Sequence, residues 1–357
     1  NNINIIYYID IIIKGFIMAS VITFGEIMLR LSPPSNLKFI QTDSFDARFG
    51  GGEANVSLAL SNLGINTAFV TKLPNNDIGQ ACINELRRYG VDVSNIVIGG
   101  ERIGIYFLEK GASQRGSKVI YDRANSSISK ANIKDFNWDK IFNNAKWFHL
   151  TGITPALGEN VSEICIEACK KAKEKNLTVS LDLNFRKKLW TSEEANKTMS
   201  KLMPYVDICM ANEEDAEKVF GIKAKDSNII EGKLSHEGYK EVAKKIIDKF
   251  KVKKVGITLR GSISASENLW SCMLYNGEEY FFSKEYLIKI VDRVGGGDSF
   301  SAGLIYSFLN DKDDKEALEF ATALSCLKHS IEGDFNLVSI DEVMTVYNGD
   351  ASGRIQR

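Results

Sequence analysis

The chain has 357 residues, of which 44% are hydrophobic and 25% charged, and its net charge is −1. This length accommodates one large α/β domain or two modest ones. The proportions of hydrophobic and charged residues are typical of a soluble globular protein. The chain has no excess of basic residues that would favour a nucleic acid as its partner. The six cysteines form no CxxC, and Cys165 and Cys169 are interpreted as buried thiols of a reducing, cytoplasmic protein.

The first 17 residues, NNINIIYYIDIIIKGFI, differ in composition from the rest of the chain. They lack the basic start of a signal peptide, carry Asp10 within the apolar stretch, and are shorter than the about 20 residues of a membrane-spanning helix. We hypothesise that Met18 is the natural start and that residues 1–17 lie outside the fold. The folded domain is then expected over 18–345, followed by a tail of 346–357.

Strands and helices alternate along most of the chain. The predicted order is strand 20–32, helix 54–63, strand 66–73, helix 77–90, strand 146–153, helix 160–175, strand 177–185, helix 192–203, strand 206–212, helix 213–220, helix 237–250 and strand 253–261. Such alternation predicts an α/β fold with a mostly parallel sheet covered on both faces. His149, on the strand at 146–153, is interpreted as a structural residue.

Two stretches, 28–49 and 102–123, alternate apolar and polar residues with no helix between them. The second is expected to be a hairpin with GASQRGS as its turn. Together they predict a small antiparallel sheet that projects from the main body as a lid, a dimer contact or both.

The run DRVGGGDSF at 292–300 places three glycines before an apolar helix that is predicted to start near Asp298. It is neither a P-loop, which requires GxxxxGK[ST], nor a GxGxxG dinucleotide fingerprint. A helix start offers unpaired N–H groups, which can cradle a phosphoryl group, and Asp298 could accept a hydroxyl proton. On these residues alone, an ordinary turn with an N-cap aspartate remains the alternative.

VDRVGGGDSFSAGLIY resembles the C-terminal signature DTxGAGDxFxAG of the ribokinase-like (PfkB) carbohydrate kinases, and FGGGEANVSLALSNLG resembles their N-terminal glycine signature. The resemblance spans residues 20–340. GEIMLRLSPP, VIYDR, LDLNFRKKLW and KHSIEGDFN are most similar to the branch that acts on 2-keto-3-deoxygluconate. This chain departs from the family in Gly296, where Ala is usual, and in Arg293-Val294, where a Thr-bearing pair is usual.

The resemblance implies a three-layer, Rossmann-like core with a β-sheet lid, and ATP and Mg²⁺ as cosubstrates. A monovalent cation and a homodimer or larger homo-oligomer formed through the lids are further family features. The partners would be a sugar acid and ATP, with neither nucleic acid nor membrane.

The resemblance also implies roles for individual residues. Asp298 would be the base that deprotonates the terminal 6-hydroxyl, and the amides of Gly295, Gly296 and Gly297 would form the anion hole. The substrate would be bound by Gly51, Gly52, Asn55, Tyr106, Tyr121, Arg123, Arg186 and Asp334. The nucleotide would be bound by Asn184, Asn212, Thr258, Arg260, Gly261, Gly295 and Gly297. Asp215 or Glu214 would contact the magnesium through water.

The two arginines distinguish between substrates, because a guanidinium binds a carboxylate with paired, charge-assisted hydrogen bonds. Arg123 and Arg186 therefore favour a sugar acid, with 2-keto-3-deoxy-6-phosphogluconate as the product. A fructokinase or ribokinase type of neutral-sugar kinase is the first alternative. A non-catalytic sugar-acid sensor is a second, which the intact Asp298 disfavours, and the missing GxGxxG disfavours a NAD-linked dehydrogenase.

Overall fold

A computed structural model describes residues 19–212, 214–223 and 236–350. The predicted extension 1–17 and the end of the predicted tail lie outside these residues. Within the described part, the last helix, α11 (Ile340–Tyr347), continues two residues beyond the expected domain boundary at 345. No helix among these residues is long and apolar enough to cross a membrane.

The core of the described chain is a nine-stranded sheet in the order β14-β13-β12-β11-β10-β9-β1-β4, with β15 also paired to β13. Its strands are β1 (Val21–Phe24), β4 (Thr67–Val70), β9 (Trp147–Thr151), β10 (Thr178–Asp182), β11 (Ile208–Ala211), β12 (Lys254–Ser262), β13 (Glu267–Tyr275), β14 (Tyr280–Phe282) and β15 (Tyr286–Lys289). Every pairing from β4 to β12 is parallel. The mostly parallel α/β sheet is confirmed.

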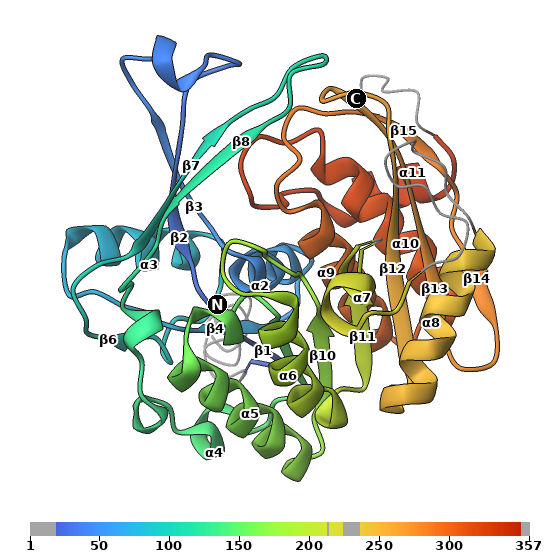
Figure 1. The fold of residues 1–357 in the computed structure, drawn as a ribbon, viewed down its shortest axis with the longest axis horizontal. Helices are drawn as coiled ribbons and strands as arrows, with labels where there is room; N and C mark the ends of the chain where they lie inside the picture. The colour runs from blue at the N-terminus through green and yellow to red at the C-terminus, as the bar shows by residue number, and fades with distance from the viewer. Residues whose placement is uncertain (1–18, 213, 224–235, 351–357) are drawn as a thin grey trace, which may run out of the picture.

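Helices cover both faces of this sheet (Figure 1). Successive strand residues point to opposite faces, so Val21 joins one apolar cluster while Ile22 joins the other. The Val21 face packs against α2 (Gly52–Asn62), α9 (Gly296–Leu309) and α10 (Asp314–Lys328). The Ile22 face packs against α4 (Trp138–Ile141), α5 (Glu159–Glu174), α6 (Ser192–Leu202), α7 (Asp215–Phe220) and α8 (His236–Phe250). Helix α3 (Asp77–Arg88) packs in a third cluster beside β4.

A second sheet forms the predicted lid, projecting from the core at the upper left of Figure 1. It consists of β3 (Asp46–Gly50), β2 (Met28–Ser32), β7 (Gly104–Glu109) and β8 (Lys118–Asp122), in that order. The β3/β2 and β7/β8 pairs are antiparallel, as predicted, whereas the central β2/β7 pair is parallel. The short strands β5 (Lys72–Leu73) and β6 (Val97–Ile98) pair separately.

The structure differs from the sequence-based expectations in two places near the glycine run and the nucleotide residues. Helix α9 begins at Gly296, two residues before Asp298, so Asp298 lies inside the first turn. The family resemblance puts Thr258, Arg260 and Gly261 in a loop at the end of the predicted strand 253–261, whereas all three lie within β12, which extends to Ser262. The strand continues because β13, which the sequence patterns left unassigned, pairs with it in antiparallel fashion as far as Ser262.

Candidate active site

A cavity of about 540 Å³ opens where the parallel strands end, beneath the lid. Its walls come from the ends of β10 and β11, the starts of α2 and α9, and the lid strands β7 and β8. Ligand-binding pockets commonly have volumes of about 300–1,000 Å³, and open α/β sheets bind ligands at the carboxyl ends of their strands. The predicted site residues line this single cavity, with Gly261 as the exception.

Asp298 faces the start of α2 from the first turn of α9. The Asn55 amide donates a hydrogen bond of 2.7 Å to the Asp298 carboxylate, and the Asn55 carbonyl oxygen accepts one of 3.2 Å from the Gly51 N–H. Asn55 is only 3% exposed. The two glycine motifs are therefore joined by a side-chain contact between residues 243 positions apart in sequence, and this contact orients the carboxylate.

The buried Glu53 holds the start of α2 in place. Its carboxylate accepts hydrogen bonds of 2.9 Å from both the N–H and the hydroxyl of Thr151, and one of 2.5 Å from the Thr154 hydroxyl. Burial raises the pKa of Glu53 to about 7, against the opposing effect of these hydrogen bonds. Glu53 was not predicted from the sequence, where it is merely an acid within a glycine-rich stretch.

Burial raises the pKa of Asp298 from 3.8 to about 6. The hydrogen bond from Asn55 and the charges of Arg186 and Lys328 act in the opposite direction, and the charge of Asp334 adds to the rise. A carboxylate with a pKa of about 6 is ionised at neutral pH and is a stronger base than an ordinary aspartate. General bases work best when their pKa lies near the operating pH.

The glycine turn before α9 is sterically constrained at Gly295 and Gly296 but not at Gly297. Gly295 has a φ of +86°, and a Cβ there would lie 2.2 Å from the Asp334 carbonyl oxygen. Gly297 has open space where a Cβ would be. Because the N–H groups of a first helical turn lack acceptors within the helix, this turn presents donors toward the cavity that Gly295, Gly296 and Gly297 line.

The departures from the family signature have local packing partners. A Cβ at Gly296 would lie 2.7 Å from the imidazole of His329, which is fixed by a 2.7 Å hydrogen bond to the Ser325 carbonyl and by Trp270 at 4.7 Å between ring centroids. Alanine at 296 would therefore meet a ring with little freedom to move. Val294 packs into the apolar cluster of the lid.

Three lid residues reach the cavity as predicted. Tyr106 and Tyr121 face each other across the β7/β8 pair with their ring centroids 6.2 Å apart. Arg123 lies 5.3 Å from the Tyr121 ring centroid and forms a buried ion pair with Glu26, whose other oxygen accepts a 2.6 Å hydrogen bond from the Ser126 hydroxyl. Among the described residues, the buried Nε of Arg123 has no hydrogen-bond partner.

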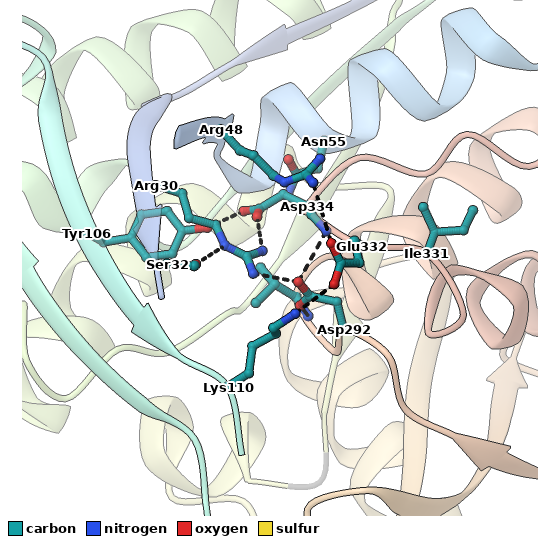
Figure 2. A network of polar contacts seen from close by, with 12 residues as sticks. Arg30, Ser32, Arg48, Asn55, Tyr106, Lys110, Asp292, Ile331, Glu332 and Asp334 are labelled. Carbon is teal, nitrogen blue, oxygen red and sulfur yellow. Dashed lines mark hydrogen bonds and ion pairs between the residues drawn. The ribbon is translucent and has the colours of Figure 1, made fainter. Parts of the chain in front are cut away.

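A buried polar network joins the lid to the glycine turn (Figure 2). Arg30, on β2, donates to Asp334 at 2.7 Å and to Asp292 at 2.5 Å, and the Tyr106 hydroxyl donates to Asp334 at 2.5 Å. Asp292 also accepts from the N–H groups of Val294 at 3.1 Å and Gly333 at 3.1 Å. Arg30 was not predicted as a site residue, because it stands in the alternating apolar and polar pattern of a strand, as many half-buried residues do.

The opposite end of the cavity is lined by the predicted nucleotide residues Asn184, Asn212, Thr258 and Arg260. Arg293 joins them, and its pKa is lowered by burial and by the charge of Arg260. Two guanidinium groups that repel each other beside a cavity favour an anionic ligand there. The glycine at 261 was predicted to join this group, but it packs against Leu269 instead.

Acidic groups also face this end. Asp182, at the end of β10, lines the cavity, and its pKa is raised well above the usual range by burial and by the charges of Asp215 and Asp298. Carboxylates held close together in this way suit a cation. Among the described residues, no group of three His, Cys, Asp or Glu side chains is arranged to hold a metal.

The two predicted magnesium contacts differ in their surroundings. The Asp215 carboxylate accepts hydrogen bonds from the N–H groups of Phe185 at 3.0 Å and Asn212 at 3.2 Å, so backbone donors occupy both of its oxygens. Glu214 is exposed and lines the cavity. Of the two, Glu214 has the freer carboxylate for a water-mediated contact.

Comparisons with known proteins agree with this geometry. A sequence profile described as pfkB family carbohydrate kinase matches residues 18–337. The 2-dehydro-3-deoxygluconokinase structure from Thermotoga maritima is 52% identical, with a TM-score of 0.90, and the match covers 93% of this chain and all of that one. The 2-dehydro-3-deoxygalactonokinase of Haloferax volcanii is 31% identical over 94% of this chain and 98% of its own length.

A fructokinase from Xylella fastidiosa, solved with bound ATP, is 20% identical with a TM-score of 0.73 over 93% of this chain and 99% of its own, and shows the shared fold alone. Because the profile match and the relative at 31% identity both extend over most of the sequence, the chain belongs to the pfkB family of carbohydrate kinases.

Proposed function

We propose that this protein transfers the γ-phosphoryl group of ATP to the terminal hydroxyl of 2-keto-3-deoxygluconate, also called 2-dehydro-3-deoxygluconate. The observation that carries the proposal is the shared cavity. Asp298 and the glycine turn lie there together with Arg123 and Arg186, which can bind a carboxylate. The names of the relatives from Thermotoga and Haloferax support the same substrate class.

In this reaction Asp298 accepts the proton of the sugar hydroxyl while Asn55 keeps the carboxylate oriented. The hydroxyl oxygen attacks the γ-phosphorus, and ADP leaves. The N–H groups at the start of α9 stabilise the charge on the transferring group. Phosphoryl transfer depends mainly on positioning and charge stabilisation, so a base and an anion hole supply what the protein must add.

The sugar acid would lie beneath the lid. Tyr106, Tyr121 and Arg123 line this part of the cavity, with Gly51 and Gly52 on its opposite wall. The Gly51 and Gly52 backbones allow the substrate to lie close to α2. The Arg123 guanidinium is anchored by Glu26, and its position is therefore fixed before the substrate arrives.

The nucleotide would lie across the end of β12, with its phosphates toward Arg260, Arg293 and the glycine turn. Mg²⁺ prefers oxygen ligands, keeps several waters and is usually held by substrate phosphates with one or two carboxylates. Asp182 and Glu214 line this end of the cavity, and their carboxylates would contact the waters of the ion. When bound, the ion would neutralise charge on the β- and γ-phosphates.

An ADP-release assay over a panel of sugar acids and neutral sugars tests this proposal. We expect 2-keto-3-deoxygluconate or its galacto epimer to give the highest kcat/KM. Replacing Arg186 with Ala should lower kcat/KM for the sugar acid by at least about tenfold, or 1.4 kcal/mol, and lower it less for neutral sugars. The exposed Arg87 provides the control variant. A best substrate without a carboxylate would instead identify a neutral-sugar kinase.

We further propose that the protein is cytoplasmic and forms a homodimer through its lids. Five of the six cysteines are buried and all are free thiols. The lid region exposes apolar side chains, with Ile40 91%, Ile120 54% and Phe45 42% exposed. Light scattering coupled to size exclusion would show a dimer, and Ile40→Lys should convert it to a monomer.

A further inference from the structure

Lys328, the last residue of α10, is fully buried with 0% exposure. It does not line the cavity, so it is outside the set of residues that touch substrate. Burial of an ammonium group is costly unless other groups replace its hydration shell. Burial also lowers the pKa of Lys328, against the charges of Asp292 and Asp334. The position of this charge inside the protein requires an explanation.

Two backbone carbonyl oxygens accept hydrogen bonds from the ammonium. The Lys328 Nζ donates to the carbonyl of Ile331 at 3.0 Å and to that of Asp292 at 3.5 Å. These oxygens come from the two segments that flank the anion hole, 291–295 before α9 and 328–334 after α10, and Ile331 and Asp292 appear together in Figure 2. The segments also pair directly, since Val291 donates to the His329 carbonyl at 2.8 Å.

Carbonyl oxygens that replace a hydration shell are the ligands by which proteins hold K⁺. A lysine ammonium carries the same single charge as a compact point. We propose that the segments 291–295 and 328–334 form a monovalent-cation site, and that Lys328 fills it with its own ammonium. The protein therefore carries this cation covalently and does not need K⁺ at that site.

Lys328 lies close to the glycine turn and to the proposed base Asp298. A Cβ placed on Gly295 would lie 3.3 Å from the Lys328 Cε, so the lysine stem packs directly under the glycine turn. The charge of Lys328 also acts on the carboxylates of Asp298 and Asp334. Lys328 is thus a positioning residue: its ammonium holds two carbonyls in place and stabilises the turn that forms the anion hole.

The first test compares rates in KCl and in tetramethylammonium chloride at equal ionic strength. We expect the wild-type rate to differ by less than about twofold. In tetramethylammonium chloride, the kcat of Lys328→Ala should be at least about thirtyfold below that of the wild type. KCl or NH₄Cl should raise the kcat of this variant by at least about tenfold. Lys328→Met fills the same space without a charge, so it should be equally impaired and should not respond to K⁺.

The second test does not depend on the identity of the substrate. The thermal unfolding midpoint of Lys328→Ala, measured without ligands, should rise with KCl concentration because an ion that binds only the folded state stabilises it. The midpoints of the wild type and of Lys328→Met should show no such K⁺-specific rise. Lys170→Ala, at an exposed lysine of α5, controls for the loss of a charge.

Three outcomes would overturn the inference. The first is a wild-type enzyme that K⁺ activates more than about threefold. The second is a Lys328→Ala variant that keeps its activity. The third is a Lys328→Ala variant whose activity and unfolding midpoint do not respond to K⁺. A variant that stays unfolded in every salt counts as this outcome. If the panel assay finds a different best substrate while these salt effects appear, only the substrate assignment fails.

Discussion

The two walls of the cavity are built differently. On the core wall, Asp298, Asn55 and Glu53 are held by short hydrogen bonds between buried helices and strand ends. On the lid wall, a thin sheet has one face toward the cavity and exposed apolar side chains such as Ile120. The polar contacts between the lid and the core include the buried ion pairs of Arg30 and Arg123.

This difference separates two tasks. In the proposed mechanism the core wall supplies the base and the anion hole of the phosphoryl transfer. The lid wall contributes Tyr106, Tyr121 and Arg123 to the proposed contacts with the sugar acid. Substitutions on the core wall are therefore expected to lower kcat for every substrate, whereas substitutions on the lid wall should change which substrate is preferred.

The largest effect is expected on the core wall. Asp298→Asn should lower kcat by about 10²–10⁴-fold, because it removes the base while it keeps the shape of the side chain. The unfolding midpoint at neutral pH should not fall, because burial disfavours the charged carboxylate of Asp298, as its raised pKa indicates, and asparagine carries no charge. Asp77→Asn, in the first turn of α3, is the matched control. An Asp298→Asn enzyme with wild-type kcat would refute the mechanism.

The second effect concerns the contact between the walls. Arg30→Ala should lower the free energy of unfolding by about 3–5 kcal/mol, since it leaves Asp292 and Asp334 buried without their partner. Arg48 lies directly opposite Arg30 in the β2/β3 pair, but its side chain is 47% exposed and its pair with Glu332 is 3.5 Å long. Arg48→Ala should therefore cost at most about 1 kcal/mol in urea denaturation. If Arg30→Ala and Arg48→Ala lowered the free energy of unfolding equally, the buried network around Arg30 would stabilise the fold no more than a surface ion pair does.

The third prediction uses pH. Since Asp298 must be ionised to act and its pKa is about 6, kcat/KM should fall about tenfold per pH unit below pH 6 and level off above it. The Asn55 hydrogen bond lowers that pKa, so Asn55→Ala should move the descending limb to higher pH. A profile that stays flat through pH 6 would exclude Asp298 as the titrating base.

The smallest effect is expected at Gly296. Alanine there meets the fixed ring of His329, and overpacking of this kind costs about 1–3 kcal/mol. Gly296→Ala should lower both kcat and the unfolding midpoint, and adding His329→Ala should recover part of the loss in kcat. A double-mutant cycle measures the coupling. Additive losses would mean that the two residues act independently.

Strands, helices and their ends have local signatures, so the sequence patterns predicted the sheet and the lid, whereas the grouping of the site residues followed from the family resemblance. The patterns did not predict β13, whose apolar run ENLWSCMLY has no turn signal that separates it from a buried helix. The family resemblance placed Gly261 in a strand-end loop, but the residue lies inside β12, because the pairing with β13 that extends this strand is a long-range contact. Arg30, Glu53 and Lys328 were missed for the same reason: burial and the partner of a charge depend on tertiary packing.

The ion pairs of Arg30 have a consequence for how ligands bind. Arg30 belongs to the lid strand β2, yet its partner Asp292 caps the turn that would receive the phosphates. A sugar that stabilises the position of the lid is therefore expected to stabilise the nucleotide end as well, and by thermodynamic reciprocity ATP would raise the affinity for the sugar by the same factor. The two substrates are expected to bind cooperatively although their proposed positions lie at different ends of the cavity.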